Sequence, residues 1–389
     1  MTCRVHTATR AIAILLALAP MPIGATSSPL AAEPLPLQPV ANQRLTDDLG
    51  RDDRIPSDRA ALLLAIDRSL GYLDTPASVA AYQDYPVPGI TRARVRRSLV
   101  RFRQLVQQTS SPEELQAAVR REFVFYRAAG SDGQGTVAFT GYYEPVFAAS
   151  RTRTADYRYP LYRRPADFEQ WQSPHPARAD LEGRHGTGAG SPLAGSELAW
   201  LRDRLEAFLV HVQGSATLRF PDGSSTSITY HGKTDRPYAS IGKELVADGH
   251  LTRDELSLPA VLAHFRSRPA DLSRYLPRNE SFVFFQEAPA ASPLGTLSVP
   301  VTADRSIATD KSLMPPGALA LIHTQIPDFD ATGALMTPTV SRYVLDQDTG
   351  SAIRGAGRVD IFLGRGTAAG ARAGEIDWTG ELYYLIVSE

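Results

Sequence analysis

Two aspartates near the C-terminal end of the chain, Asp348 and Asp360, have the type and spacing that acid–base chemistry requires. They are twelve residues apart, on either side of a glycine-containing stretch, residues 350–357, that is typical of a chain reversal. If strands flank this reversal, the two carboxyl groups can approach each other and shift one another's pKa values. Asp360 also lies inside an apolar run, residues 359–363, where a carboxylate is costly unless it is paired, hydrogen-bonded or protonated. We therefore predict that Asp360 carries out the chemistry. Asp348 on its own is more often a turn residue, and at most assists Asp360.

Other common catalytic groups lack their motifs. The histidines after residue 33 never pair at metal-ligand spacing, and no H-E-x-x-H motif occurs. There is no G-x-S-x-G motif, and the single cysteine is Cys3. Residues 186–190 resemble a phosphate-binding loop only superficially, because they lack the preceding strand and the glycine spacing. We predict no metal, no cofactor and no covalent nucleophile.

The first 32 residues have the pattern of a secretory signal. Two arginines precede an apolar run, residues 11–19, which is followed by small residues and is too short to span a membrane. We predict a signal peptide over residues 1–32, cleaved after Ala25 or Ala32, and export to the periplasm or cell envelope, or secretion. Because Cys3 precedes the apolar run, we expect no lipid anchor, and the mature form should have no transmembrane helix.

Composition excludes further classes. Of the 389 residues, 43% are hydrophobic and 21% charged, which is enough to bury one large or two ordinary cores. The net charge of −1 provides no basic field for nucleic acid. Nothing in the sequence indicates oligomerisation, so we expect a monomer.

The elements that must position the acids change character along the chain. Residues 33–50 contain a proline-rich stretch and read as a linker. We expect Asp58 to cap a first helix, a second helical pattern covers residues 91–108, and a third helix follows a capping box at Ser111. Another helix is predicted over residues 197–212.

Short strand patterns separated by glycine and proline dominate the last third of the chain. They predict a compact barrel. The predicted strands cover residues 136–139, 281–286, 297–301, 319–323, 341–345, 358–363 and 382–387, and a hairpin is predicted around residues 221–223.

A series of short motifs resembles, in family order, the MltA-type lytic murein transglycosylases. The motifs are residues 139–145 (FTGYYEP), 213–215, 231–233, 240–243, 279–285, 302–306 and 348–353, together with Asp360. The resemblance implies a mainly β fold with flanking helices, in which a double-psi β-barrel domain and a second β-rich inserted domain border a glycan-binding cleft. We assign the barrel, with its N-terminal helices, to residues 51–146 and 281–389, and the inserted domain to residues 147–280.

The resemblance also assigns roles to residues. It implies that Asp360 is catalytic, that Asp348 is a second active-site acid, and that Thr140 is a polar group of the cleft. Aromatic side chains are candidate sugar platforms, although core packing is an equally good interpretation. The complete set predicted to bind substrate is Thr140, Tyr142, Tyr143, Lys233, Tyr238, Ser240, Asp304 and Arg305. Among these, Lys233 and Arg305 could meet acidic groups of peptide stems or simply pair with nearby aspartates.

The implied activity acts on peptidoglycan glycan strands. It cleaves the β-1,4 bond between N-acetylmuramic acid and N-acetylglucosamine and leaves a 1,6-anhydro sugar. One acid suffices for this reaction, because the attacking C6 hydroxyl already belongs to the substrate. Two alternatives remain open at this point: a muramidase that uses water, and a non-catalytic peptidoglycan-binding protein, since the fold alone does not fix the function.

Overall fold

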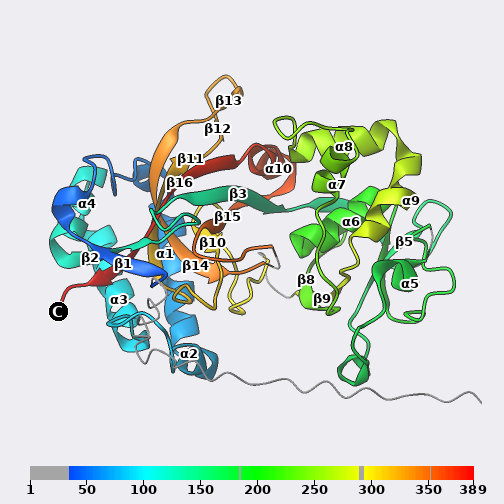
Figure 1. Cartoon of the computed structure of the whole chain (residues 1–389), viewed down its shortest axis with the longest axis horizontal. Coiled ribbons are helices and arrows are strands. Elements are labelled where there is room, and N and C mark those ends of the chain that lie inside the picture. Colours follow the sequence, from blue (N-terminus) through cyan, green and yellow to red (C-terminus); the bar gives the residue numbers. More distant parts are fainter. Residues whose placement is uncertain (1–34, 184, 289–292, 351) are drawn as a thin grey trace, which may run out of the picture. The chain divides into compact units, whose positions relative to one another are not determined.

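The computed structural model describes residues 35–183, 185–288, 293–350 and 352–389 (Figure 1). The predicted signal peptide and Cys3 lie outside these residues. Within the described part of the chain, no helix combines the length and the apolar character needed to cross a bilayer.

One sheet contains eight strands drawn from both ends of the chain, in the order β1-β2-β16-β11-β14-β10-β15-β3. Their bounds are β1 Leu37–Val40, β2 Phe123–Ala128, β3 Val137–Glu144, β10 Ser306–Ala308, β11 Leu319–Gln325, β14 Thr339–Asp348, β15 Arg358–Arg365 and β16 Asp377–Val387.

This sheet closes on itself. The long strand β16 pairs with β11 through its second half and with β3 through its first half, so six strands (β16, β11, β14, β10, β15 and β3) form a ring. Fully buried side chains from several of these strands fill the core, among them Phe139, Ile307, Leu345 and Ile361. The barrel predicted from the strand patterns is confirmed.

Four helices precede the barrel strands: α1 Ile55–Leu73, α2 Pro76–Ala81, α3 Arg92–Gln108 and α4 Pro112–Glu122. The hydroxyls of Thr91 and Ser111 cap α3 and α4 by accepting backbone N–H groups, and the cap at Ser111 confirms the predicted capping box. The expected cap at Asp58 is wrong, because Asp58 lies inside α1 in a non-helical conformation and its carboxylate pairs with Arg305.

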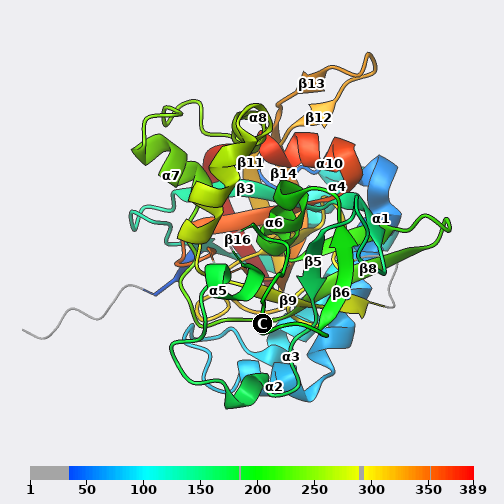
Figure 2. The same ribbon diagram turned by 90° about the vertical axis from the view of Figure 1, so that its right-hand side faces the viewer.

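A second sheet is built from the middle of the chain, in the order β5-β6-β4-β7-β8-β9. Figure 2 labels four of its strands, β5, β6, β8 and β9. Its strands are β4 Val146–Ser150, β5 Tyr159–Tyr162, β6 Glu197–Leu201, β7 Ser215–Arg219, β8 Ser225–Lys233 and β9 Val283–Ala288. The same stretch contains five helices: α5 Arg178–Glu182, α6 Arg204–Gln213, α7 Ile241–Ala247, α8 Leu258–Ser267 and α9 Leu272–Tyr275. Two further elements belong to the C-terminal part of the chain. Helix α10 Gly366–Gly374 follows β15, and a small hairpin of β12 Asp328–Phe329 and β13 Leu335–Met336 follows β11. The two β-rich units agree with the predicted fold class.

Three predicted boundaries need correction. The proposed linker contains β1, because Leu37–Val40 pairs with β2 and Leu37 is fully buried. The strand predicted at residues 281–286 belongs to the inserted sheet and not to the barrel, since β9 pairs with β8. The strand predicted at residues 297–301 is absent from the described elements, where this stretch is turns with an isolated bridge.

The helix predicted over residues 197–212 starts seven residues later. Glu197–Leu201 forms strand β6, whose buried leucines happen to fall at helical spacing with those of α6. The helix begins where Asp203 provides a cap, since its carboxylate accepts the backbone N–H groups of Leu205 (2.6 Å) and Glu206 (3.2 Å).

Candidate functional site

The two predicted acids lie in one row across neighbouring strands of the barrel. On β10, Ala308 is the register partner of Asp360 on β15 and also of Asp348 on β14. Beyond Asp360, the next strand places Thr140 of β3 as its partner. Adjacent strands are about 4.8 Å apart, so the backbones of the two aspartates are separated by roughly 10 Å.

Asp360 is a half-buried acid with a raised pKa. Burial raises the pKa of its carboxyl, and the negative charge of Asp348 adds a smaller increase. The hydroxyl of Thr140 donates a hydrogen bond to the Asp360 carboxylate, and the nearby Arg358 guanidinium acts in the same direction, so both oppose the increase in pKa. Arg358 in turn donates to the Thr140 oxygen at 2.9 Å, which orients the hydroxyl hydrogen toward Asp360.

Asp348 has a different surrounding. Its carboxylate accepts a hydrogen bond from the Tyr142 hydroxyl (2.8 Å) and from the backbone N–H groups of Thr296 (2.9 Å) and Thr349 (2.8 Å). Burial raises the pKa of Asp348, and these three donors oppose it. The burial of Tyr142, together with the Asp348 charge, holds the pKa of that phenol well above its usual range, so Tyr142 remains a donor.

The two acids differ in the number of groups that donate hydrogen bonds to their carboxylates. Within the described residues, three groups donate to the Asp348 carboxylate and only the Thr140 hydroxyl donates to that of Asp360. Hydrogen-bond donors stabilise the ionised form of a carboxyl group. Asp348 is therefore the better anion, and Asp360 is the better holder of a proton.

Sequence reasoning missed two cations of this region. Arg358 precedes Asp360 by two positions on the same strand, so strand alternation alone puts both side chains on one face and could have identified it. Lys311 donates to the backbone carbonyl of Asp348 and to the carboxylate of Asp346. It lies in a turn after β10, where no periodicity indicates its direction.

The predicted residues of the inserted unit differ in their relation to the acid row. Burial raises the pKa of Tyr238, and the charge of Asp360 contributes to that increase, so this tyrosine lies within electrostatic range of the acid. Burial lowers the pKa of Lys233, helped by Arg354 of the barrel unit. Ser240 caps α7, where its hydroxyl accepts a backbone N–H. The cleft itself stays a prediction.

Asp304 was expected to contact substrate, and the structure contradicts this. The residue is 6% exposed, and its carboxylate accepts hydrogen bonds from Arg342 (3.0 Å) and Arg372 (2.6 Å). A carboxylate held by two buried guanidinium groups balances their charge inside the fold and is not accessible to a glycan strand.

The same correction applies to Arg305. Its side chain is fully buried and pairs with the carboxylates of Asp52 and Asp58. The alternative interpretation, an ion pair with nearby aspartates, is the one that the structure supports. Within the described residues, no three acidic, histidine or cysteine side chains gather as metal ligands.

Tyr143, also expected to bind substrate, faces away from the acid row. Side chains alternate along a strand, so Thr140 and Tyr142 share one face of β3 and Tyr143 lies on the other. There it packs against Gly370 of α10, where an added Cβ would lie only 2.9 Å from its ring. The structure does not bring Tyr143 together with Asp360.

Comparisons with known proteins agree with this architecture. A family model described as the MltA specific insert domain matches residues 138–286, and one described as a 3D domain matches residues 305–386, which include both acids. Membrane-bound lytic murein transglycosylase A of Escherichia coli strain K12 is 34% identical over 262 residues, covering 67% of this chain and 68% of the relative.

Solved structures extend the similarity to most of the chain. Escherichia coli MltA with bound chitohexaose has a TM-score of 0.69 and 27% identity, and the match covers 91% of this chain and 95% of that one. The membrane-bound lytic murein transglycosylase of Agrobacterium tumefaciens has the same TM-score with 29% identity, covering 90% and 97%. The closed ring and the inserted sheet are thus the double-psi β-barrel and inserted domain that the resemblance implied, and the chain belongs to the MltA family of lytic murein transglycosylases.

Proposed function

We propose that this enzyme cleaves the β-1,4 bond between N-acetylmuramic acid and N-acetylglucosamine in peptidoglycan and forms a 1,6-anhydro-N-acetylmuramic acid end, with Asp360 as its acid–base residue. The observation that carries the proposal is the row across four barrel strands, which holds two carboxyl groups whose pKa values are raised by burial. Among the described residues, one group donates a hydrogen bond to Asp360 and three donate to Asp348. Family membership supplies the reaction class, lytic transglycosylation of murein.

Asp360 acts twice in this scheme. In its protonated form it donates the proton to the glycosidic oxygen as the bond to the anomeric carbon breaks. As a carboxylate it then removes the proton from the C6 hydroxyl of the same muramic acid, whose oxygen bonds to the anomeric carbon. Because nucleophile and electrophile belong to one sugar, little entropy is lost in bringing them together, and no second carboxylate is needed to activate water.

The neighbouring groups fit the two states of Asp360. After proton transfer, the Thr140 hydroxyl, oriented by Arg358, stabilises the Asp360 carboxylate until it is protonated again. We assign to Asp348 the stabilisation of positive charge that develops on the sugar ring, because its three donors favour the ionised form against the effect of burial. Tyr238 is the residue of the inserted unit that we propose to contact the sugar.

Product analysis tests the proposal against its two alternatives. Purified sacculi are digested with the enzyme, and the masses of the released muropeptides are measured by mass spectrometry. We expect ends that are one water lighter than reducing ends. Reducing ends would identify a muramidase, and the absence of release with retained sacculus binding would identify a binding protein.

The proposal also concerns location and partners. Peptidoglycan lies in the cell envelope, and the names of the relatives describe them as membrane-bound, so we propose that this enzyme acts in the envelope on glycan strands. The monomeric state and the site of signal cleavage stay predictions.

A further inference from the structure

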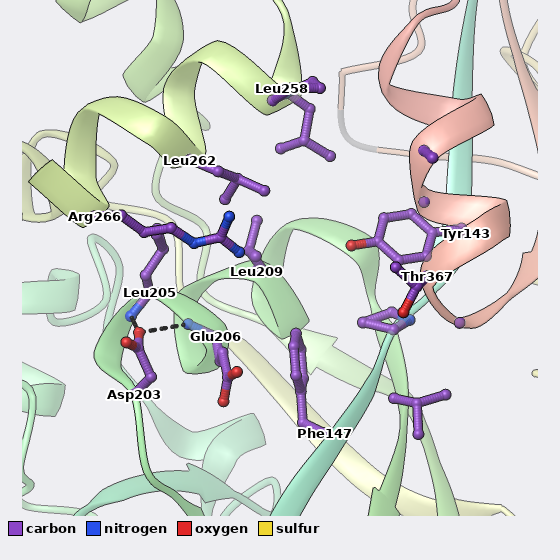
Figure 3. Close-up of a pocket in the computed structure, with 16 residues that line it drawn as sticks. Tyr143, Phe147, Asp203, Leu205, Glu206, Leu209, Leu258, Leu262, Arg266 and Thr367 are labelled. Carbon is purple, nitrogen blue, oxygen red and sulfur yellow. Dashed lines mark hydrogen bonds between the residues drawn. The ribbon is translucent and has the colours of Figure 1, made fainter. Parts of the chain in front are cut away.

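A pocket of about 370 Å³ (Figure 3) is lined by Tyr143, which lies on the side of β3 that faces away from the acids. Its wall combines residues of three helices, α6, α8 and α10, with the segment that leads out of β3. None of Thr140, Tyr142, Asp348 or Asp360 lines it. Because Tyr143 lines the pocket while Thr140 and Tyr142 face the acid row, β3 separates the two sites.

Three polar side chains in this pocket, those of Tyr143, Glu206 and Arg266, have no hydrogen-bond or ion-pair partner among the described residues. Tyr143 is 9% exposed, and its hydroxyl points into the pocket (Figure 3). Within the described residues, neither this hydroxyl nor the side chains of Arg266 and Glu206 make a hydrogen bond or an ion pair. The effect of Arg266 on the pKa values of both Tyr143 and Glu206 shows that the three groups share one neighbourhood. Polar groups grouped in this way have the arrangement that small-molecule sites use to fix a ligand.

Two further polar residues line the wall, Thr367 and Asp203, and the Asp203 carboxylate is occupied by the backbone N–H groups of Leu205 and Glu206. The remainder is apolar and consists mainly of leucines and prolines. Its larger residues are Pro145, Val146, Phe147, Leu205, Leu209, Leu258, Pro259 and Leu262. Sugar rings need many hydrogen-bonding partners, which this wall does not provide. Short aliphatic groups beside a carboxylate suit it better, because the carboxylate can pair with Arg266 while methyl groups contact the leucines.

We propose that this pocket binds the carboxylate-terminated, alanine-containing end of a peptidoglycan stem peptide, a choice of ligand that rests on the proposed murein substrate. Arg266 pairs with the terminal carboxylate, Tyr143 donates a hydrogen bond to it, and the leucines contact the alanine methyl groups. An enzyme holding a glycan strand in the acid row thus holds a stem peptide on the opposite face of β3, from the same or a neighbouring strand.

Glu206 makes this binding depend on pH. Burial raises the pKa of Glu206 to about 7, with a contribution from Asp203, while Arg266 and Arg202 oppose the increase. In its protonated form Glu206 donates a hydrogen bond to a bound carboxylate, and in its ionised form it repels one. Affinity for a carboxylate ligand therefore falls as pH rises through about 7, whereas affinity for an ammonium ligand would rise.

Calorimetric titration with N-acetyl-D-alanyl-D-alanine tests the proposal, with the C-terminal amide of the same dipeptide as the uncharged probe. We expect the dipeptide with its free carboxylate to bind at pH 6 and the amide to bind at least about tenfold more weakly. The affinity for the dipeptide carboxylate should fall about tenfold between pH 6 and pH 8. Glu206→Gln, which retains a donor without the charge, should bind equally at both pH values. Arg266→Gln should lower the affinity for the dipeptide carboxylate at least about tenfold, as expected for a lost charge-assisted hydrogen bond.

The matched control is Arg253→Gln, since Arg253 is exposed, lies in the same inserted unit and does not line the pocket. Equal binding of acid and amide, affinity that rises with pH, or an unchanged affinity in Arg266→Gln would overturn the proposal. Asp360→Asn separates this proposal from the catalytic one. It should leave dipeptide binding intact, and loss of dipeptide binding in Asp360→Asn but not in Arg266→Gln would place the peptide at the acid row and refute the pocket.

Discussion

Asp348 and Asp360 are both register partners of Ala308, which lies between them on the short strand β10. The parallel pairing of β14 with β10 and the antiparallel pairing of β15 with β10 bring together two residues from opposite ends of a reversal. The register, and not the turn, sets the separation of the acids.

Replacement of the acid should abolish turnover and leave the fold intact. Asp360→Asn preserves shape but cannot donate and recover a proton, so we expect release of muropeptides to fall by about 10²–10⁴-fold, the usual contribution of a general acid–base residue. Turbidity loss of purified sacculi measures this, with circular dichroism to verify folding. Asp84→Asn is the control, because Asp84 is exposed and no described residue bonds its carboxylate. A folded Asp360→Asn enzyme with wild-type turnover would remove Asp360 from the mechanism.

The same substitution should make the protein more stable at neutral pH. The pKa of Asp360 is raised in the folded state, so the folded protein binds more protons than the unfolded chain between the two pKa values, and its stability falls as pH rises through that interval. Asparagine does not ionise, so the variant does not lose stability as pH rises through this interval.

Urea unfolding of both proteins measures this difference. Asp360→Asn should have the higher unfolding free energy at pH 7, and the difference should vanish below the pKa of an unfolded aspartate, about 3.9. A difference that grows toward acid pH would mean that the folded protein favours the ionised carboxyl.

Removal of the Thr140 hydroxyl should move the pH profile of activity. The hydrogen bond from Thr140 lowers the pKa of Asp360, so Thr140→Val raises that pKa further. The protonated, active form then persists to higher pH, and the alkaline limb of the rate profile shifts upward. Thr140→Ser retains the donor and should keep the wild-type limb. An alkaline limb that does not move in Thr140→Val would indicate that another group controls it.

Asp304 should prove essential for stability. Asp304→Asn leaves two buried guanidinium groups, Arg342 and Arg372, facing a neutral amide, which costs about 3–5 kcal/mol of unfolding free energy. Asparagine tolerates the positive φ of 60° at this position, so the loss reports the charge and not the backbone. The comparison variant is Asp67→Ala, which breaks an exposed pair with Arg103 and should cost at most about 1 kcal/mol. Equal losses in the two variants would contradict a structural role for Asp304.

Local chemistry made much of the fold predictable. The caps at Thr91 and Ser111 and the strands around Asp360 follow from residues adjacent in sequence. Asp360 could be singled out because one charged residue interrupts an apolar run. What failed was decided by distant partners. The segment Leu37–Val40 has no strand pattern in its own sequence, because it is short and contains proline. It is a strand only because it pairs with β2, which lies far along the chain.

The substrate-binding set failed for the same physical reason. A motif that contains an aspartate and an arginine looks the same whether its side chains face a ligand or an ion pair. The acids that neutralise Arg305 come from positions about 250 residues earlier in the chain. Likewise, the direction of Tyr143 depends on which residue of β3 is placed opposite Asp360, and a change of register by one residue would reverse it.

The division of the chain between its two sheets also fixes an order of assembly. All strands of the inserted sheet come from one continuous stretch, Val146 to Ala288, whereas the ring closes only when β16, the last strand of the chain, pairs with β3. A chain that is delivered from its N-terminus can complete the inserted sheet first, because its contacts are local, and must wait for its final residues to complete the barrel. Asp360 acquires its buried surroundings only at that last step. A chain that stops short of β16 would therefore contain both Asp348 and Asp360 and still lack the closed barrel that surrounds them.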